Sequence, residues 1–180
     1  MSAITHHIPE DMMAAYAAGT LPHPYAMVVA AHISLCSECR AALGAYHAVG
    51  GALLEKTANI AVTNSLKSNV MAMLDAPVQP KPVYDSQGIY PGPVMEALHG
   101  RSPRWKTLGM GVKQSILSET DSGSVRLLYI PAGQAVPDHS HNGLELTLVL
   151  QGSFSDETGR FGVGDVEIGD EDLEHTPIAD

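Results

Sequence analysis

Two groups of side chains in this 180-residue sequence have the types and spacing of metal ligands. The first contains Cys36 and Cys39, the only cysteines, together with His32. Side chains four residues apart share one face of a helix, and Cys39 follows Cys36 by about one turn, so the three groups converge. Thiolates and imidazoles in a closed tetrahedral set are typical of structural Zn²⁺. We therefore predict a zinc site that takes one further ligand from the N-terminal part.

His6 and His7 are the candidates for that ligand, because they precede the first expected helix and either could reach the other three residues. The alternative is a redox-active pair of Cys36 and Cys39, with His32 on the surface. Redox C-x-x-C pairs usually follow a strand in a βαβ unit, whereas this pair lies among predicted helices. The sequence therefore favours zinc.

The second group lies in the C-terminal half, where His139, His141 and Glu145 share parity. On a β-strand such residues project from one face, so two imidazoles and a carboxylate would face a common point. A solvated hairpin is the alternative, but it leaves the parity and the flanking Gly133 and Gly152 as coincidences. These ligands suit a divalent ion such as Zn²⁺, Fe²⁺, Mn²⁺ or Ni²⁺.

The two halves of the chain differ in the secondary structure that carries these candidate ligands. Apolar residues at three- and four-residue spacing predict four helices, with cap signals at Pro9, Gly19 and Asn64 or Ser65. The helices are expected near residues 10–18, 24–35, 37–54 and 64–75. Short β-type runs separated by glycine, proline and aspartate follow at residues 112–117, 125–130, 144–150, 153–155 and 166–168.

The sequence therefore predicts an α + β protein of two domains. Residues 1–75 would form a four-helix zinc module, and residues 94–180 an antiparallel β-barrel. Between them, residues 76–93 hold five of the twelve prolines and predict an extended, semi-rigid linker. Only five residues follow His175, although closing a barrel normally takes one or more further strands. We expect either a truncated chain or a closing edge supplied by a neighbouring element.

Composition excludes several classes of protein. The 20 acidic and 10 basic residues give a net charge of −10, the wrong sign for phosphate backbones, so we expect no direct binding to nucleic acid. No run approaches the ~20 apolar residues of a membrane span. The N-terminus lacks the basic and apolar regions of a secretory signal. The sequence predicts a cytoplasmic protein without membrane contact.

The spacing His32-x3-Cys36-x2-Cys39, with a histidine 25 residues upstream of His32, resembles that of zinc-binding anti-sigma factors. The stretches Ala-Tyr-Ala-Ala-Gly-Thr-Leu and Ala-His-Ile-Ser-Leu-Cys-Ser-Glu-Cys-Arg are similar to the ChrR branch of that family. The resemblance implies that His7, with His6 as a weaker candidate, completes the set of Zn²⁺ ligands. It also implies an extracytoplasmic-function (ECF) sigma factor as partner, released on an oxidative signal such as singlet oxygen.

Residues 133–152 match the pattern G-x5-H-x-H-x3-E-x6-G and are identified as the first cupin motif. The second cupin motif normally reads G-x5-P-x-G-x2-H-x3-N. Gly164 and His175 stand at its glycine and histidine, whereas its Pro, Gly and Asn are replaced by Asp170, Asp172 and Ala179. The resemblance implies a cupin barrel and favours Zn²⁺ as its metal. The implied ligands are His139, His141, Glu145 and His175.

Two functions are compatible with these features. The resemblance implies an anti-sigma factor that inserts its helical module between the two helical domains of the sigma factor and masks the surfaces that bind RNA polymerase. An apolar stripe at helical spacing would either dock there or pack on its own bundle; it consists of Leu66, Val70, Met73 and Leu74. The alternative is a cupin metalloenzyme, a dioxygenase or isomerase with a helical oligomerisation module. Because no further general acid or base is recognisable, we favour the regulator; the sequence predicts no oligomeric state.

Overall fold

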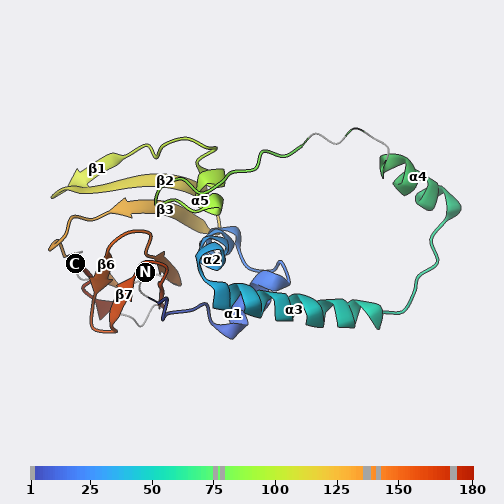
Figure 1. Ribbon diagram of the computed structural model, residues 1–180, viewed down its shortest axis with the longest axis horizontal. Helices are drawn as coiled ribbons and strands as arrows, with labels where there is room; N and C mark the ends of the chain where they lie inside the picture. The colour runs from blue at the N-terminus through green and yellow to red at the C-terminus, as the bar shows by residue number, and fades with distance from the viewer. Residues whose placement is uncertain (1–2, 75–76, 78–79, 136–138, 141–142, 171–173) are drawn as a thin grey trace.

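The computed structural model describes residues 3–180 apart from 75–76, 78–79, 136–138, 141–142 and 171–173. The protein is an α + β molecule with helices at its N-terminal end and antiparallel sheets in its C-terminal half (Figure 1). The helices are α1 (Glu10–Ala17), α2 (His23–Leu35), α3 (Ser37–Glu55), α4 (Asn64–Leu74) and α5 (Gly92–Ala97).

Local signals account for the ends of the first helices. Gly19 follows α1 with a left-handed backbone (φ 71°), which lets the N–H of Gly19 donate to the carbonyl of Tyr16. Pro24 lies in the first turn of α2, where no backbone donor is needed. Cys36 separates α2 from α3 with an extended conformation. The predicted bounds of α1–α4 are confirmed to within one residue.

The helix α4 does not complete a four-helix module. The helices α1, α2 and α3 pack on one another, whereas every residue of α4 is exposed. Figure 1 shows α4 well apart from the remaining elements, beyond the outer end of α3. The prediction that four helices form the module is therefore not confirmed, because the apolar stripe of α4 faces solvent instead of the bundle.

The C-terminal half consists of short antiparallel strands. They are β1 (Lys106–Gly109), β2 (Val112–Thr120), β3 (Gly123–Tyr129), β4 (His139–Ser140), β5 (Glu145–Leu148), β6 (Ser153–Ser155), β7 (Arg160–Gly162), β8 (Val166–Gly169), β9 (Glu174–His175) and β10 (Ile178–Ala179). In the described residues they form four sheets, with orders β1-β2-β3, β10-β6-β7, β4-β9 and β5-β8. These sheets do not join into a closed barrel, so that part of the predicted architecture is not confirmed. Hydrophobic periodicity did not predict α5, β1, β4, β7, β9 and β10, because elements this short carry little of it.

The helices and the sheets share a hydrophobic core. Val166 of β8 packs in one cluster with Met13 of α1 and Val29 and Ile33 of α2. The opposite side of α2 contacts α5 and β3, where Ala31 is buried. The helix α2 therefore lies between the other N-terminal helices and the sheets. This arrangement brings the end of α2 against the turn before β8.

Candidate metal centre

The residues of the first predicted site come from two places in the fold. His7 lies in the extended segment before α1, and His32 is in the last turn of α2. Cys36 is the N-cap of α3, with φ −99° and ψ 114°, and Cys39 is in its first turn. The Cys36 Sγ accepts a hydrogen bond from the Cys39 N–H at 3.4 Å. The junction of α2 and α3 thus positions three of the four residues locally.

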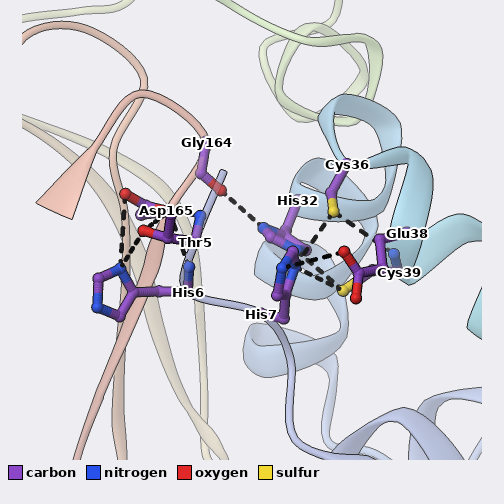
Figure 2. A network of polar contacts seen from close by, with 9 residues as sticks. All are labelled: Thr5, His6, His7, His32, Cys36, Glu38, Cys39, Gly164 and Asp165. Atoms are coloured by element: carbon purple, nitrogen blue, oxygen red, sulfur yellow. Dashed lines mark hydrogen bonds and ion pairs between the residues drawn. The ribbon is translucent and has the colours of Figure 1, made fainter. Parts of the chain in front are cut away.

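The four side chains converge with the spacing of a tetrahedral metal site (Figure 2). One donor atom from each of His7, His32, Cys36 and Cys39 lies within 4.8 Å of all the others. His32 Nε2 is 3.2 Å from Cys39 Sγ, and His7 Nδ1 is 3.4 Å from Cys36 Sγ and 3.6 Å from Cys39 Sγ. Zn–N bonds of about 2.0 Å and Zn–S bonds of about 2.3 Å place tetrahedral ligands about 3.3–3.8 Å apart. The cluster therefore fits Zn²⁺ in size as well as in donor type.

Burial shapes the protonation of this cluster. His32 is 0% exposed and each cysteine is 3% exposed. Burial lowers the pKa of His32 and raises the pKa of Cys39, so both groups favour their neutral forms when no cation is near. Neutral imidazole is the form that binds a metal, and a bound cation would favour the thiolates. The more exposed His7 has its Nε2 3.4 Å from Glu38 Oε2.

His6 and His7 point to different partners although they are adjacent. His6 Nδ1 is 3.6 Å from Asp165 Oδ2, and the His6 ring lies on Phe161 with 4.3 Å between ring centroids. Figure 2 shows His6 directed toward Asp165 and His7 directed toward the two cysteines. The structure therefore brings His7, and not His6, to the cluster.

The second predicted site is described only in part. His141 lies outside the described residues. The backbone of His139 in β4 pairs with that of His175 in β9. Glu145 begins β5 and is exposed, whereas the His175 side chain is 3% exposed. A metal site formed by these four residues stays a prediction.

Two acidic residues that the sequence analysis missed lie beside His175. Its Nδ1 is 2.7 Å from Asp156 Oδ2 and 3.2 Å from Glu167 Oε1. The three residues offer donor atoms within 4.8 Å of one another, and the carboxylates could also hold a cation. Only Glu167 could have been noticed in the sequence, because it is a glutamate between Val166 and Ile168 in a short apolar strand. Asp156 carried no signal, because only the folded chain brings its turn to β9.

These two carboxyl groups have opposite pKa shifts. Burial, together with the neighbouring Asp156 and the charge of Glu145, raises the pKa of Glu167 to about 8. Burial alone would raise the pKa of Asp156, but hydrogen bonds with Glu167, Thr158 and His175 lower it well below its usual range. At neutral pH the pair therefore holds one proton, on Glu167, while Asp156 accepts the hydrogen bond of His175.

The helices α3 and α4 each carry a group of exposed apolar side chains. These are Val49, Leu53 and Leu54 at the end of α3 and Leu66, Val70, Met71, Met73 and Leu74 of α4, each at least 50% exposed. Among the described helices, none is by itself long and apolar enough to cross a membrane; α2 and α3 meet that criterion only as a pair bent by 115°. Large exposed apolar surfaces typically mark sites of protein interaction.

Comparison with known proteins identifies the class. Residues 95–180 match the family model of the ChrR cupin-like domain. A curated relative is 52% identical over an alignment of 180 positions, which covers 98% of this chain and 84% of the relative. The chain therefore belongs to the ChrR family of anti-sigma factors. That relative is the anti-sigma-E factor ChrR of Cereibacter sphaeroides.

A solved structure has the same fold over almost the whole chain. It is the crystal structure of Rhodobacter sphaeroides SigE in complex with the anti-sigma ChrR. The matching chain has a TM-score of 0.88 and 50% sequence identity, and the match covers 99% of this chain and 93% of that chain. The likeness therefore includes the exposed α4 as well as the helices and sheets around the candidate metal cluster.

Proposed function

We propose that this chain is an anti-sigma factor that sequesters an ECF-type sigma factor. The observation that carries the proposal is the match, with a TM-score of 0.88 over 99% of this chain, to a chain from a complex of SigE with ChrR. The exposed apolar side chains of α3 and of α4 support it, because each group suits contact with the helices of a protein partner. Docking between the two helical domains of the sigma factor would mask the surfaces that bind RNA polymerase.

The cluster of His7, His32, Cys36 and Cys39 is the proposed site of a structural Zn²⁺. The mixed nitrogen and sulfur donors and their spacing support this assignment. Bound there, Zn²⁺ would supply the tie between the N-terminal segment and the junction of α2 and α3. Because α1–α3 bury few large side chains, this tie would contribute much of their stability.

A second divalent ion, Zn²⁺ or Fe²⁺, Mn²⁺ or Ni²⁺, is proposed for His139, His141, Glu145 and His175. The cupin motif supports this ligand set, and the contact of His175 Nδ1 with Asp156 supports the role of one member. A carboxylate on one ring nitrogen fixes the tautomer and the orientation of a metal-binding histidine, so Nε2 is the expected ligand atom.

Release of the sigma factor on an oxidative signal of the singlet-oxygen type is the proposed role of the C-terminal part.

We divide the chain into the anti-sigma domain at residues 1–75, a linker at 76–93 and the cupin-like domain at 94–180. A cytoplasmic location is also proposed, and the two cysteines, which form no disulfide, support it because thiols stay reduced there.

Binding and inhibition test the function directly. The full chain is mixed with purified ECF sigma factors, and complex formation is followed by size-exclusion chromatography and by transcription from a promoter specific to each sigma factor. We expect a stoichiometric complex with one of them and loss of its transcription. Normal transcription by every ECF sigma factor of the same genome, at saturating amounts of the chain, would contradict the proposal.

A cupin metalloenzyme is the second candidate, and one observation favours it. Glu167, with its pKa raised to about 8, is a carboxyl group that could exchange a proton near His175 at neutral pH. Incubation of the Fe²⁺-loaded chain with dioxygen or with small carbonyl substrates tests for turnover. Catalytic conversion that Glu167→Gln abolishes would support the enzyme.

A further inference from the structure

The N-terminal segment is bonded to the turn between β7 and β8. Asp165 Oδ1 accepts the N–H of Thr5 at 2.7 Å and that of His6 at 2.9 Å, and Oδ2 accepts the N–H of Gly162 at 2.8 Å. Asp165 is 4% exposed, and hydrogen bonds to a charged acceptor are stronger than those between neutral groups. A carboxylate of the C-terminal half therefore holds the backbone directly before His7.

The same turn also orients His32. The His32 Nδ1–H donates to the carbonyl of Gly164 at 2.8 Å, which leaves Nε2 facing Cys39 Sγ. Gly164 has φ 93°, and a Cβ at this position would lie 2.5 Å from the Ile4 Cδ1. Only glycine suits this backbone and this close approach. Two of the four residues of the first cluster are thus positioned by one turn more than 100 residues away in sequence.

Residues 164–167 begin in this turn and end beside His175 of the second candidate site. Glu167 lies two residues after Asp165 and is 3.2 Å from His175. Between them, Val166 donates its N–H to the carbonyl of His6 and belongs to the same hydrophobic core cluster as the two cysteines. Residues 164–167 therefore contact both clusters. Asp165, Val166 and Glu167 are buried, and close packing leaves little room for one end of the stretch to move alone.

We propose that residues 164–167 connect the two candidate metal sites, so that the arrangement around His175 sets how tightly the first cluster holds its metal. Asp165 is the positioning residue of this connection and acts on His7 through the backbone of Thr5 and His6. The inference rests on the proposed metal ligands. It adds a route by which a change in the cupin-like part reaches the helices of the proposed anti-sigma domain.

Cobalt binding tests the positioning role of Asp165. Bound Co²⁺ gives a thiolate charge-transfer band only where cysteine is a ligand, so the band reports on the first cluster alone. The full chain is titrated with Co²⁺ against a chelator. We expect Asp165→Asn to weaken binding about 10- to 100-fold, the usual effect of losing a group that orients metal ligands. Asp121→Asn, in the exposed turn between β2 and β3, is the matched control and should leave the affinity unchanged.

A double-mutant cycle tests the connection itself. We expect His175→Ala to weaken Co²⁺ binding at the first cluster by at least about threefold in the unaltered chain, and by less in the Asp165→Asn background. If the double variant loses Co²⁺ affinity by the product of the two single-variant factors, the two sites act independently and the proposed connection is overturned. A purely structural role for Asp165 would lower thermal stability without changing the response to His175→Ala.

A second variant and the thiolate band of the unaltered chain complete the test. If Asp165→Asn does not fold, Thr5→Pro replaces it, because proline has no N–H to donate and Asp165 remains in place. Unchanged Co²⁺ affinity in either folded variant overturns the proposal. Absence of the thiolate band in the unaltered chain would contradict the metal cluster itself, whereas a normal band that responds to neither variant contradicts only the connection.

Discussion

Cys36 shows how one residue serves both the helix and the cluster. As the N-cap of α3 its sulfur accepts the N–H of Cys39, and its thiolate would face the positive end of the helix dipole. The same sulfur is 3.4 Å from His7. Capping and metal binding therefore depend on different properties of one side chain, and a suitable substitution separates them.

Cys36→Ser keeps a good N-cap but removes the thiolate. We expect this variant to hold one metal ion fewer per chain in elemental analysis. Its free energy of unfolding should fall by at least about 2 kcal/mol, because the free energy of metal binding contributes to folding. Ser37→Ala, at an exposed neighbouring position, should change neither quantity. A Cys36→Ser protein that keeps its metal and its stability would contradict the cluster.

Glu167 makes the stability of the metal-free chain depend on pH. Its pKa is raised from 4.5 to about 8 in the folded state, so the folded state binds the proton more tightly than the unfolded state. The stabilisation is fully present below about pH 4.5 and is lost as the pH rises toward 8. The lowered pKa of Asp156 acts only in a more acid range. The lowered pKa of His32 acts in the opposite direction as the pH rises toward 6.5, so the test is the difference between two proteins. In urea unfolding between pH 5 and 8, the stability of the unaltered chain should fall more with rising pH than that of Glu167→Gln; an equal slope in both proteins would contradict the raised pKa.

Among the elements, α4 depends on interactions within its own segment, and its apolar stripe is exposed. The Leu66 N–H donates to the Thr63 Oγ1 at 3.2 Å, so Thr63 caps the helix instead of the predicted Asn64 or Ser65. An isolated helix of 11 residues is marginally stable in water. Burial of its apolar stripe against a sigma factor would supply the stability that its own bundle does not.

A charge on the stripe should therefore weaken the complex. We expect Val70→Asp to lower the affinity for the sigma factor at least about tenfold, because the aspartate would be buried without a partner. Ser68→Asp adds the same charge on the opposite face of α4 and should have little effect. Isothermal titration calorimetry compares the two variants, and equal affinities would exclude this face from the interface.

At the scale of the whole molecule, residues 164–167 contact one candidate cluster at each end. Gly164 contacts His32 of the first, and Glu167 contacts His175 of the second. The helices and the sheets share core residues, so the proposed anti-sigma and cupin-like domains are packed together and the connection between their sites is short. Such packing suits a protein in which one part inhibits and the other responds.

His141→Ala should separate inhibition from release. This variant lacks a proposed ligand of the second site, so we expect it to hold one metal ion fewer and still bind the sigma factor. After illumination with a photosensitiser, less sigma factor should be released than from the unaltered chain, as measured by size-exclusion chromatography. His23→Ala, at an exposed histidine outside both clusters, serves as control. Unimpaired release from His141→Ala would contradict a sensing role for the second metal.

The residues of the first cluster were predictable because most of their geometry is local. Residues 32–39 span one helix junction, where spacing alone dictates which side chains share a face. The bounds of α1–α4 followed in the same way from caps and apolar periodicity. The cupin motif indicated a second site in advance, but the arrangement of its four ligands stays a prediction.

The contacts between segments far apart in the sequence became known only from the folded chain. Asp165 holds Thr5 across 160 positions, Gly164 orients His32 across 132, and Asp156 meets His175 from another turn. Hydrogen bonds of this kind depend on how helices and sheets pack, which local spacing does not encode. The metal-binding residue types and the helices that carry them could thus be predicted from local sequence. Packing determined that α4 stands apart and that one turn before β8 reaches both clusters.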